Sequence, residues 1–376
     1  MKIVHAIDSM EMGGAEILVG LLCRWQLREG HRPEVHCLFK GGVLAAELEK
    51  DGIPVRIYDP GVGKLGKVRL IWSLYQTFSK ERPDVVHCHN ISPTILAGPP
   101  ARAAGTRAII STRHGLAIPY GTPSAYKGIP DAAGAFFRFR LAAAFCSRVV
   151  AVCDVAHHNL EAGPGAFLYK VSTIRNGALP MPVSTNPDPS ICKRGFTLVS
   201  VARLNWKKNH ACLLRAVALA KDQAPDLSLW VVGDGAEAAA LQRLARELGI
   251  EDRVRFTGER NDVGDWLGRA DLFVLPSLTE GMPISLIEAM AAGLPFVVTN
   301  VGAMPEVAEL SGGAGMVVDS DRPEALAAAI VRCASRRSDL AELGRRARQC
   351  YERYFTPDLM VSGYSGLYEQ CLRGES

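Results

Sequence analysis

The chain has 376 residues, which is too long for one ordinary core and predicts two domains. Hydrophobic residues make up 48% and charged residues 22%, a mix typical of a soluble globular protein, which excludes a disordered or fibrous chain. The net charge of +4 comes from residues 1–190, with 21 Lys and Arg against 15 Asp and Glu (+6), whereas residues 191–376 have 22 against 24 (−2).

Strands alternate with helices through residues 1–180. The first strand, KIVHAI, is followed by the glycine-rich turn EMGGAE and by a helix that ends near Gly30. Helices are also predicted at 43–50 and around 68–80, and the further strands are RPEVHCLF, PVRIYD, DVVHCHN, RAIISTRHG, RVVAVC and KVSTIRNG. Strands alternating with helices of about ten residues or more predict a parallel α/β sheet.

A proline-rich segment separates this region from a second one. LPMPVSTNPDPSICKR has four prolines and no periodicity, which predicts a linker at 181–194. The alternation restarts at GFTLVSVARL, and residues 195–356 predict a second doubly wound domain with helices at 210–221 and 236–248. Residues 357–376 predict a C-terminal helix that could pack back on the first domain. We expect a ligand between the domains, at the carboxyl ends of the strands.

The segment LPSLTEGMPISLIEAMAAG carries two glutamates, Glu280 and Glu288, with seven residues between them. Glu280 lies in the turn after a predicted strand, and Pro283 suits the first position of the helix that follows. The N–H groups of Ile284 and Ser285 would then be open to an anion at the helix N-terminus. This arrangement predicts a phosphate-binding site.

The spacing of Glu280 and Glu288 fits a ligand that has hydroxyls on both sides of a phosphate. Glu288 lies about five residues into the helix, roughly 7 Å along its axis. Carboxylates repel phosphates but accept hydrogen bonds from hydroxyls, so the pattern indicates a nucleoside diphosphate sugar. The alternative is that both are solvated, but an unpaired carboxylate in the apolar run ISLIEAMAAG would be costly.

Cations for such a diphosphate occur in VSVARLNWKKNH. Arg203 and Lys208 follow a strand end, where a guanidinium and an ammonium can hold pyrophosphate oxygens. Two cations in a loop are also common on plain surfaces, and we expect Lys207 to be solvated.

In the first domain, Gly13 and Gly14 lie between the first strand and the first helix. Glycines there let a ligand approach the backbone, although a tight turn explains them equally well. His114 ends a strand and could donate to a sugar hydroxyl or to a transferring oxygen. His87 and His89 are alternative candidates, and all three could instead be structural histidines.

Several other features limit cofactors and location. The ten cysteines are scattered without a Cys-x-x-Cys pair, so we expect free thiols and a reducing cytoplasm. His157-His158 lacks the HExxH pattern of a helical zinc site, and we expect no metal and no organic cofactor. MKIVHAIDS is too short for a signal peptide, and no segment is long and apolar enough to span a membrane.

The charge asymmetry leaves two interpretations. Ordinary variation between surfaces is one, and a basic N-terminal face that meets anionic lipid or an acidic acceptor is the other. The stretch KLGKVRLIWSLYQTFSK could be a surface helix at a membrane, although packing on the N-terminal sheet is favoured. We expect no nucleic-acid partner.

Together these motifs resemble the retaining GT-B glycosyltransferases of family 4, the group 1 glycosyl transferases. The resemblance covers almost the whole chain, through GGAE, RHG, RNG, ARLNWKKNH, VVGDGAE, FTGERNDV and, most specifically, PSLTEGMPISLIEAMAAGLPFVVTNVGAMPEV. It implies two Rossmann-like doubly wound domains facing a central cleft. It also implies transfer of a hexose-type sugar from a nucleoside diphosphate sugar to a glycan or lipid-linked acceptor, with retention, in cell-surface polysaccharide or glycolipid synthesis.

The resemblance also implies roles for individual residues. Glu280 would contact the donor hexose and Glu288 the ribose, and His114 would face the sugar. The implied catalytic residues are Glu280 and His114, and the implied donor-binding residues are Gly13, Gly14, Arg203, Lys208, Met282, Pro283, Ile284, Ser285 and Glu288. Ala202 departs from the glycine that many members have there, which is minor for the chemistry.

Three other functions are weighed against this one. A dinucleotide oxidoreductase is suggested by VVGDGAEAAAL, but the third glycine and the acidic ribose ligand of that fingerprint are missing. A sugar-nucleotide epimerase would have the same two-domain shape. A non-catalytic binding subunit is the third, and the presence of Glu280, Arg203, Lys208 and Glu288 argues against it.

Overall fold

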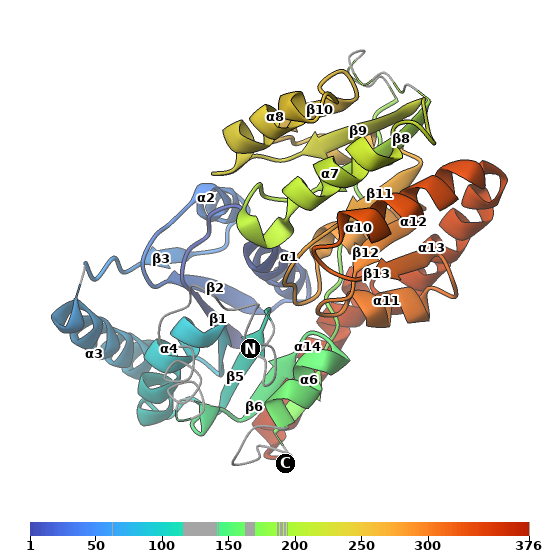
Figure 1. The fold of residues 1–376 in the computed structure, drawn as a ribbon. Coiled ribbons are helices and arrows are strands. Elements are labelled where there is room, and N and C mark those ends of the chain that lie inside the picture. Colours follow the sequence, from blue (N-terminus) through green and yellow to red (C-terminus); the bar gives the residue numbers. More distant parts are fainter. Residues whose placement is uncertain are drawn as a thin grey trace. The chain divides into compact units, whose positions relative to one another are not determined.

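The computed structural model describes residues 1–61, 63–115, 141, 143–161, 170–185, 188, 191, 193 and 195–375. The chain divides into two units, one formed by Met1–Asn176 with Pro357–Ser376 and the other by Gly177–Thr356. Each unit holds one parallel sheet with helices packed against it (Figure 1).

The first unit has a seven-stranded sheet in the order β3-β2-β1-β4-β5-β6-β7, and every pairing is parallel. Its strands are β1 Lys2–Ile7, β2 Arg32–Cys37, β3 Val55–Ile57, β4 Val85–His89, β5 Ala108–Arg113, β6 Arg148–Ala151 and β7 Val171–Thr173. Its helices are α1 Gly14–Arg28, α2 Val43–Lys50, α3 Lys64–Glu81, α4 Ile91–Ala103, α6 Asp154–Glu161 and α14 Pro357–Arg373. The predicted parallel α/β sheet is confirmed.

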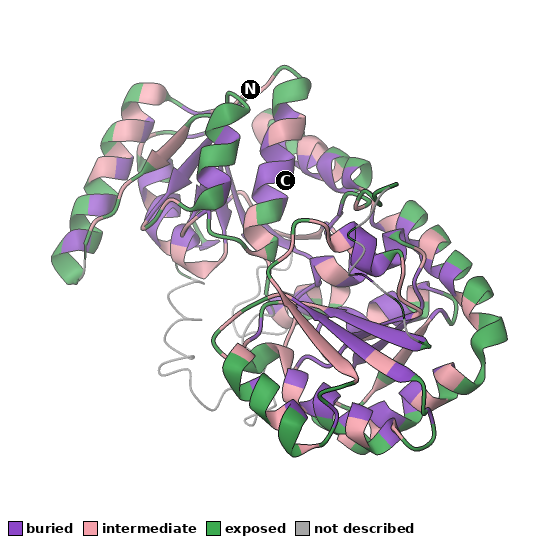
Figure 2. Ribbon diagram, turned by 90° about the horizontal axis from the view of Figure 1, so that it is seen from above, coloured by how far each residue is buried: buried purple, intermediate pink, exposed green. Residues whose placement is uncertain are grey.

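The second unit has a six-stranded parallel sheet in the order β10-β9-β8-β11-β12-β13. Its strands are β8 Phe196–Val201, β9 Leu227–Val232, β10 Val254–Gly258, β11 Leu272–Leu275, β12 Phe296–Thr299 and β13 Gly315–Val318. Its helices are η2 Trp206–Lys208, α7 His210–Ala220, α8 Ala238–Glu247, α9 Val263–Leu267, α10 Ile284–Ala291, α11 Met304–Leu310, α12 Pro323–Ser335, η3 Arg337–Asp339 and α13 Leu340–Tyr354. Figure 2 shows buried central strands beneath helices whose outer faces are exposed.

Both sheets reverse their strand order at one place. In the first unit the reversal lies between β1 and β4, and in the second between β8 and β11. In open parallel sheets, ligands bind outside the carboxyl ends of the strands at such a reversal. The segments that follow these four strands are therefore the places to look for a site.

Helix α4 is absent from the sequence predictions. It contains Pro99 and Pro100, and prolines normally end a helix because they lack the N–H group. Here Leu96, Ala97 and Ala101 are buried in the core that α4 shares with α3, and this packing outweighs the loss of two backbone hydrogen bonds. Tertiary contacts, which local patterns do not reveal, determine this element.

The cysteines are free thiols within the part of the chain that the structure describes. Of the nine described cysteines, eight are buried, and burial raises the pKa of Cys212 and Cys333 to about 11. They stay protonated and pack as small apolar side chains, as expected. Among the described helices, none has the length and hydropathy needed to cross a bilayer.

Candidate active site

Glu280 lies at the carboxyl edge of the second sheet, five residues after β11. Its Oε1 accepts hydrogen bonds from Lys208 Nζ at 2.5 Å and from Ser277 Oγ at 2.6 Å. Its side chain is 10% exposed and that of Lys208 is 21% exposed. Among the described residues no group donates to Oε2, so the carboxylate is held by one oxygen and offers the other to a ligand.

The turn that carries Glu280 rests on the segment after β12. Ala303 N donates to Gly281 O at 2.8 Å. Gly302 has a φ of +59°, and a Cβ at this position would lie 2.3 Å from the Glu280 carbonyl oxygen. A side chain at position 302 would therefore push the Glu280 turn out of place.

Helix α10 begins one residue later than predicted. Pro283 has a φ of −71° and a ψ of 125°, so it is the extended N-cap residue and not the first helical residue. Its fixed φ suits this extended conformation equally well. The first helical hydrogen bond runs from Ile287 N to Pro283 O, so the N–H groups of Ile284, Ser285 and Leu286 precede the ladder and meet the positive end of the helix dipole.

Glu288 lies in the middle of α10. Burial raises the pKa of its carboxyl to about 7. None of the described residues donates a hydrogen bond to this carboxylate. A mostly buried acid without a protein partner is costly, and a ligand hydroxyl would remove that cost.

The loop after β8 carries the predicted cations. Arg203 and Lys207 are exposed, and Lys208 is half-buried at the end of η2. Lys207 is solvated, as expected, while its carbonyl accepts from Leu278 N at 2.7 Å. This bond joins the cation loop to the Glu280 turn, so the two predicted motifs form one local structure.

The glycines of VVGDGAE are used for packing between protein segments. Gly233 has a φ of +133°, and a Cβ there would lie 2.1 Å from the carbonyl oxygen of Ala202. The same loop supports Leu204, whose N donates to Asp234 O at 2.8 Å. These glycines therefore hold the Arg203 loop, which weakens the dinucleotide interpretation of the motif.

In the first unit, the turn after β1 leads into α1. Gly13 is the N-cap residue, with a φ of −171° that any residue adopts, and Gly14 starts the helix. Asp8 directly follows β1; one of its carboxyl oxygens is buried without a hydrogen-bond partner among the described residues, and burial raises its pKa. Asp8 was not among the residues predicted from the sequence, although an acid directly after a central strand is a usable signal.

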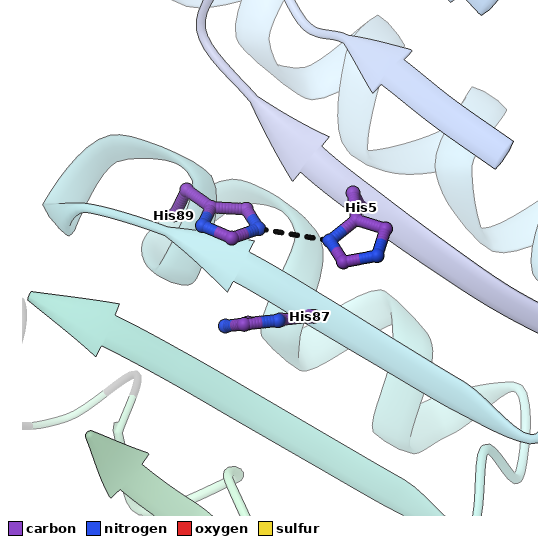
Figure 3. Close-up of side chains that lie close together, drawn as sticks. All are labelled: His5, His87 and His89. Atoms are coloured by element: carbon purple, nitrogen blue, oxygen red, sulfur yellow. Dashed lines mark hydrogen bonds between the residues drawn. The ribbon is translucent and has the colours of Figure 1, made fainter. Parts of the chain in front are cut away.

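His114, which is partly exposed, follows β5 and contacts a group of buried histidines in the first unit. Its Nε2 lies 2.9 Å from His89 Nδ1, and its backbone N donates to Asn90 Oδ1 at 3.2 Å. His89 Nε2 lies 3.0 Å from His5 Nδ1 (Figure 3). Burial lowers the pKa of His114 to about 4, so the ring is neutral at physiological pH.

Two family models match the chain. Residues 12–178 match Glycosyltransferase Family 4, and residues 195–336 match Glycosyl transferases group 1, so that together they cover most of the sequence. The chain belongs to the family 4, group 1 glycosyl transferases.

Individual relatives of this glycosyl transferase match over shorter spans. N-acetyl-alpha-D-glucosaminyl L-malate synthase of Bacillus anthracis is 33% identical over 150 residues, which cover 40% of this chain and 39% of that protein. UDP-Gal:alpha-D-GlcNAc-diphosphoundecaprenol alpha-1,3-galactosyltransferase of Escherichia coli is 29% identical over 246 residues, 61% of each. The chain thus spans from two to three fifths of the length of these curated relatives.

The solved structures extend the likeness of this glycosyl transferase to its whole length. Anabaena HepE in complex with UDP has a TM-score of 0.83 at 21% identity, covering 98% of this chain and 100% of that one. At this identity the likeness establishes the fold, which is the GT-B class with two Rossmann-like units.

In this glycosyl transferase the predicted residues fall into two groups. Arg203, Lys208, Glu280, Glu288 and the start of α10 lie together in the second unit, at the carboxyl ends of β8 and β11. Gly13, Gly14 and His114 lie in the first unit, after β1 and β5.

His5 was missed in the sequence. It pairs in register with His87 on the neighbouring strand, although a histidine in the apolar strand KIVHAI is itself an unusual residue. Within the described part of the chain, two sets of side chains are close enough to ligate a metal: His5, His87 and His89, and Glu34, His36 and Glu81. His157 binds Thr173 and Glu161, which gives it a structural role.

Proposed function

We propose that the protein transfers a hexose-type sugar from a nucleoside diphosphate sugar to a glycan or lipid-linked acceptor, with retention of anomeric configuration. The observation that carries the proposal is the pair Glu280 and Glu288. Each has a carboxylate oxygen that no described residue binds, and they flank a helix N-terminus suited to a phosphate. Family membership, a relative named as a UDP-galactose-using galactosyltransferase and a structural neighbour in complex with UDP support a nucleoside diphosphate sugar as the donor.

In this proposal Glu280 Oε2 accepts a hydrogen bond from a hexose hydroxyl, and Glu288 accepts from the ribose. Arg203, Lys208 and the N–H groups at the start of α10 stabilise the negative charge that grows on the leaving diphosphate. Lys208 has three N–H donors, so it can bind Glu280 and still reach a phosphate oxygen. These cations supply the charge without a metal ion.

A donor screen tests the proposal. Purified protein incubated with UDP-, GDP- and ADP-sugars plus lipid-linked and glycan acceptors should release a nucleoside diphosphate from one donor class. The product should keep the anomeric configuration of the donor, as read by proton NMR. Donor conversion without any acceptor would indicate an epimerase, and no conversion with any pair would count against an enzyme.

The titration of Glu288 gives a second test. Its folded-state pKa of about 7 lies above its usual value, so the folded protein binds more protons than the unfolded chain between about pH 4.5 and 7. Stability of the free protein should therefore fall as pH rises through this window. Affinity for the nucleotide should rise as pH rises through this window, because only the ionised carboxylate accepts hydrogen bonds from both ribose hydroxyls.

We expect UDP-sugar affinity to be up to about tenfold higher at pH 8 than at pH 6, since the ionised fraction rises about that much around a pKa of 7. Isothermal titration calorimetry at both pH values measures this. Glu288→Gln should bind more weakly and lose the pH dependence. Equal pH dependence in the variant would show that Glu288 does not contact the nucleotide.

We further propose that α3 contacts an anionic membrane surface. Leu65, Val68 and Trp72 lie on one helix face and are 64%, 62% and 59% exposed. The same helix carries exposed cations at positions 64, 67, 69 and 80, and its one acid, Glu81, is paired with Lys2 and Arg56. Exposed apolar side chains on a helix with a net positive charge complement a bilayer with anionic headgroups.

Vesicle co-sedimentation tests this contact. Binding to vesicles with anionic lipid should exceed binding to neutral vesicles, and Leu65→Gln with Trp72→Gln should weaken it at least tenfold, given roughly 1.5–3 kcal/mol per buried apolar side chain. Leu359→Gln, at an exposed leucine on α14, is the matched control and should bind normally. Equal binding by both variants would rule out α3 as the contact.

A further inference from the structure

Three histidines and a glutamine form one continuous chain of hydrogen bonds inside the first unit. Gln26 Oε1 lies 2.9 Å from His5 Nε2, His5 Nδ1 lies 3.0 Å from His89 Nε2, and His89 Nδ1 lies 2.9 Å from His114 Nε2. Gln26, His5 and His89 are at most 1% exposed. The far end of the chain is His114 Nδ1, a buried atom that has no hydrogen-bond partner among the described residues.

The glutamine sets the direction of every bond in this chain. The Gln26 atom that lies 2.9 Å from His5 Nε2 is the amide oxygen Oε1. An amide oxygen can only accept, so His5 Nε2 is the donor of this bond. His5 therefore carries its proton on Nε2.

The remaining tautomers follow one after another because each ring is neutral. Burial lowers the pKa of His5 and His114 to about 4 and holds the pKa of His89 well below its usual range, with Arg113 acting on His114 in the same direction. His5 Nδ1 is then an acceptor, so His89 donates from Nε2 and accepts at Nδ1. His114 must donate from Nε2, which leaves its Nδ1 without a proton.

We propose that Gln26, His5 and His89 are positioning residues that fix His114 in the tautomer protonated on Nε2, so that its unpaired Nδ1 accepts a hydrogen bond from a ligand hydroxyl. The ligand part of this inference rests on the proposed glycosyl transfer, whereas the tautomer does not depend on it. In this state His114 accepts a hydrogen bond at Nδ1, whereas from the sequence we expected His114 to donate one.

A metal site is the competing explanation of the histidine cluster. The nitrogens of His5, His87 and His89 lie within 4.8 Å of one another, and neutral imidazoles are good ligands. However, both nitrogens of His5 and His89 are occupied in the chain described above. Those of His87 bind Tyr368 and Thr112, each at 2.7 Å. A metal would have to break these bonds, so the hydrogen-bond chain explains the arrangement better.

Nitrogen-15 NMR of histidine-labelled protein tests the tautomer directly, because protonated and unprotonated ring nitrogens have distinct chemical shifts. His114→Asn identifies the His114 signals by their loss. We expect wild-type His114 to show an unprotonated Nδ1 and a protonated Nε2. The opposite pattern would overturn the proposal, and so would stoichiometric shifts of His5, His87 and His89 on adding Zn²⁺.

Two substitutions at Gln26 show whether the chain sets this state. Gln26→Leu removes the acceptor, so His114 should become a mixture of tautomers, while Gln26→Glu can still accept from His5 and should keep the wild-type pattern. Tyr58→Phe removes a hydroxyl that lies 3.1 Å from His36, a buried histidine outside the chain, and should leave His114 unchanged. An unchanged His114 in folded Gln26→Leu would overturn the positioning role.

Kinetics separate this inference from the proposed function. With a donor and acceptor identified, Gln26→Leu should lower kcat/KM about five- to tenfold, the loss expected for one hydrogen bond, and Gln26→Glu should restore most of it. If NMR shows the expected tautomer but Gln26→Leu leaves kcat/KM unchanged, His114 does not bind a ligand hydroxyl, while the tautomer assignment stands. If wild-type protein transfers no sugar, the proposed function fails and the NMR result still decides the tautomer.

Discussion

Glu280→Gln should lower the rate of sugar transfer roughly 100- to 1000-fold while leaving the protein folded. The glutamine keeps one carbonyl oxygen, which can still accept from Lys208 and Ser277. It replaces Oε2 with an NH₂ group, which cannot accept from a hexose hydroxyl. It also removes the negative charge beside the reacting sugar, and losses of this size follow the removal of one group that stabilises the transition state.

Initial rates of nucleoside diphosphate release at saturating donor measure this effect, and thermal unfolding reports on the fold. Glu309→Gln, at an exposed glutamate on α11, is the matched control and should retain full activity. Glu280→Ala should be equally inactive but less stable, because it leaves Lys208 without its partner. A Glu280→Gln rate within a few-fold of wild type would show that Glu280 takes no part in transfer.

The sequence predicted most of the fold because its signals are local. Apolar strands, separated by amphipathic helices, predict two parallel sheets, and Phe196–Val201 and Val43–Lys50 lie where the patterns place them. One helix that was not predicted, α4, depends on burial of Leu96 and Ala101, which outweighs two prolines. Such a contact with the rest of the core leaves no local pattern.

The candidate site was predicted only in part, because its supporting contacts join distant segments. The two carboxylates and the cations were identified, since charged residues inside apolar runs stand out. The hydrogen bond from Leu278 N to Lys207 O links motifs more than 70 residues apart, and no spacing rule predicts it. His5 and Gln26 were missed for the same reason, because their importance lies in a chain of bonds that crosses three elements.

Gly302→Ala should weaken donor binding by displacing the neighbouring Glu280 turn. The new Cβ would lie 2.3 Å from Glu280 O and 2.7 Å from Gly281 O, closer than such contacts allow, so the turn must move. Movement of that turn carries Glu280 away from Lys208 and Ser277. We expect at least a tenfold loss of UDP-sugar affinity and a larger loss of turnover, as misplacement of about 1 Å can cost 100-fold.

An alanine at position 302 would also strain the backbone. Substitution of a second glycine with a similar φ separates this strain from the displacement of Glu280. Gly312 has a φ of +61°, close to the +59° of Gly302, but nothing lies within 4 Å of a Cβ placed there. Gly312→Ala should therefore cost roughly 1–2 kcal/mol of stability, the cost of the left-handed conformation, and keep full UDP-sugar affinity. Similar affinity losses in both variants, measured by calorimetry, would show that strain and not displacement of Glu280 is responsible. If only Gly302→Ala loses binding, the close approach of Gly302 to the Glu280 carbonyl holds the turn in the shape that binds the donor.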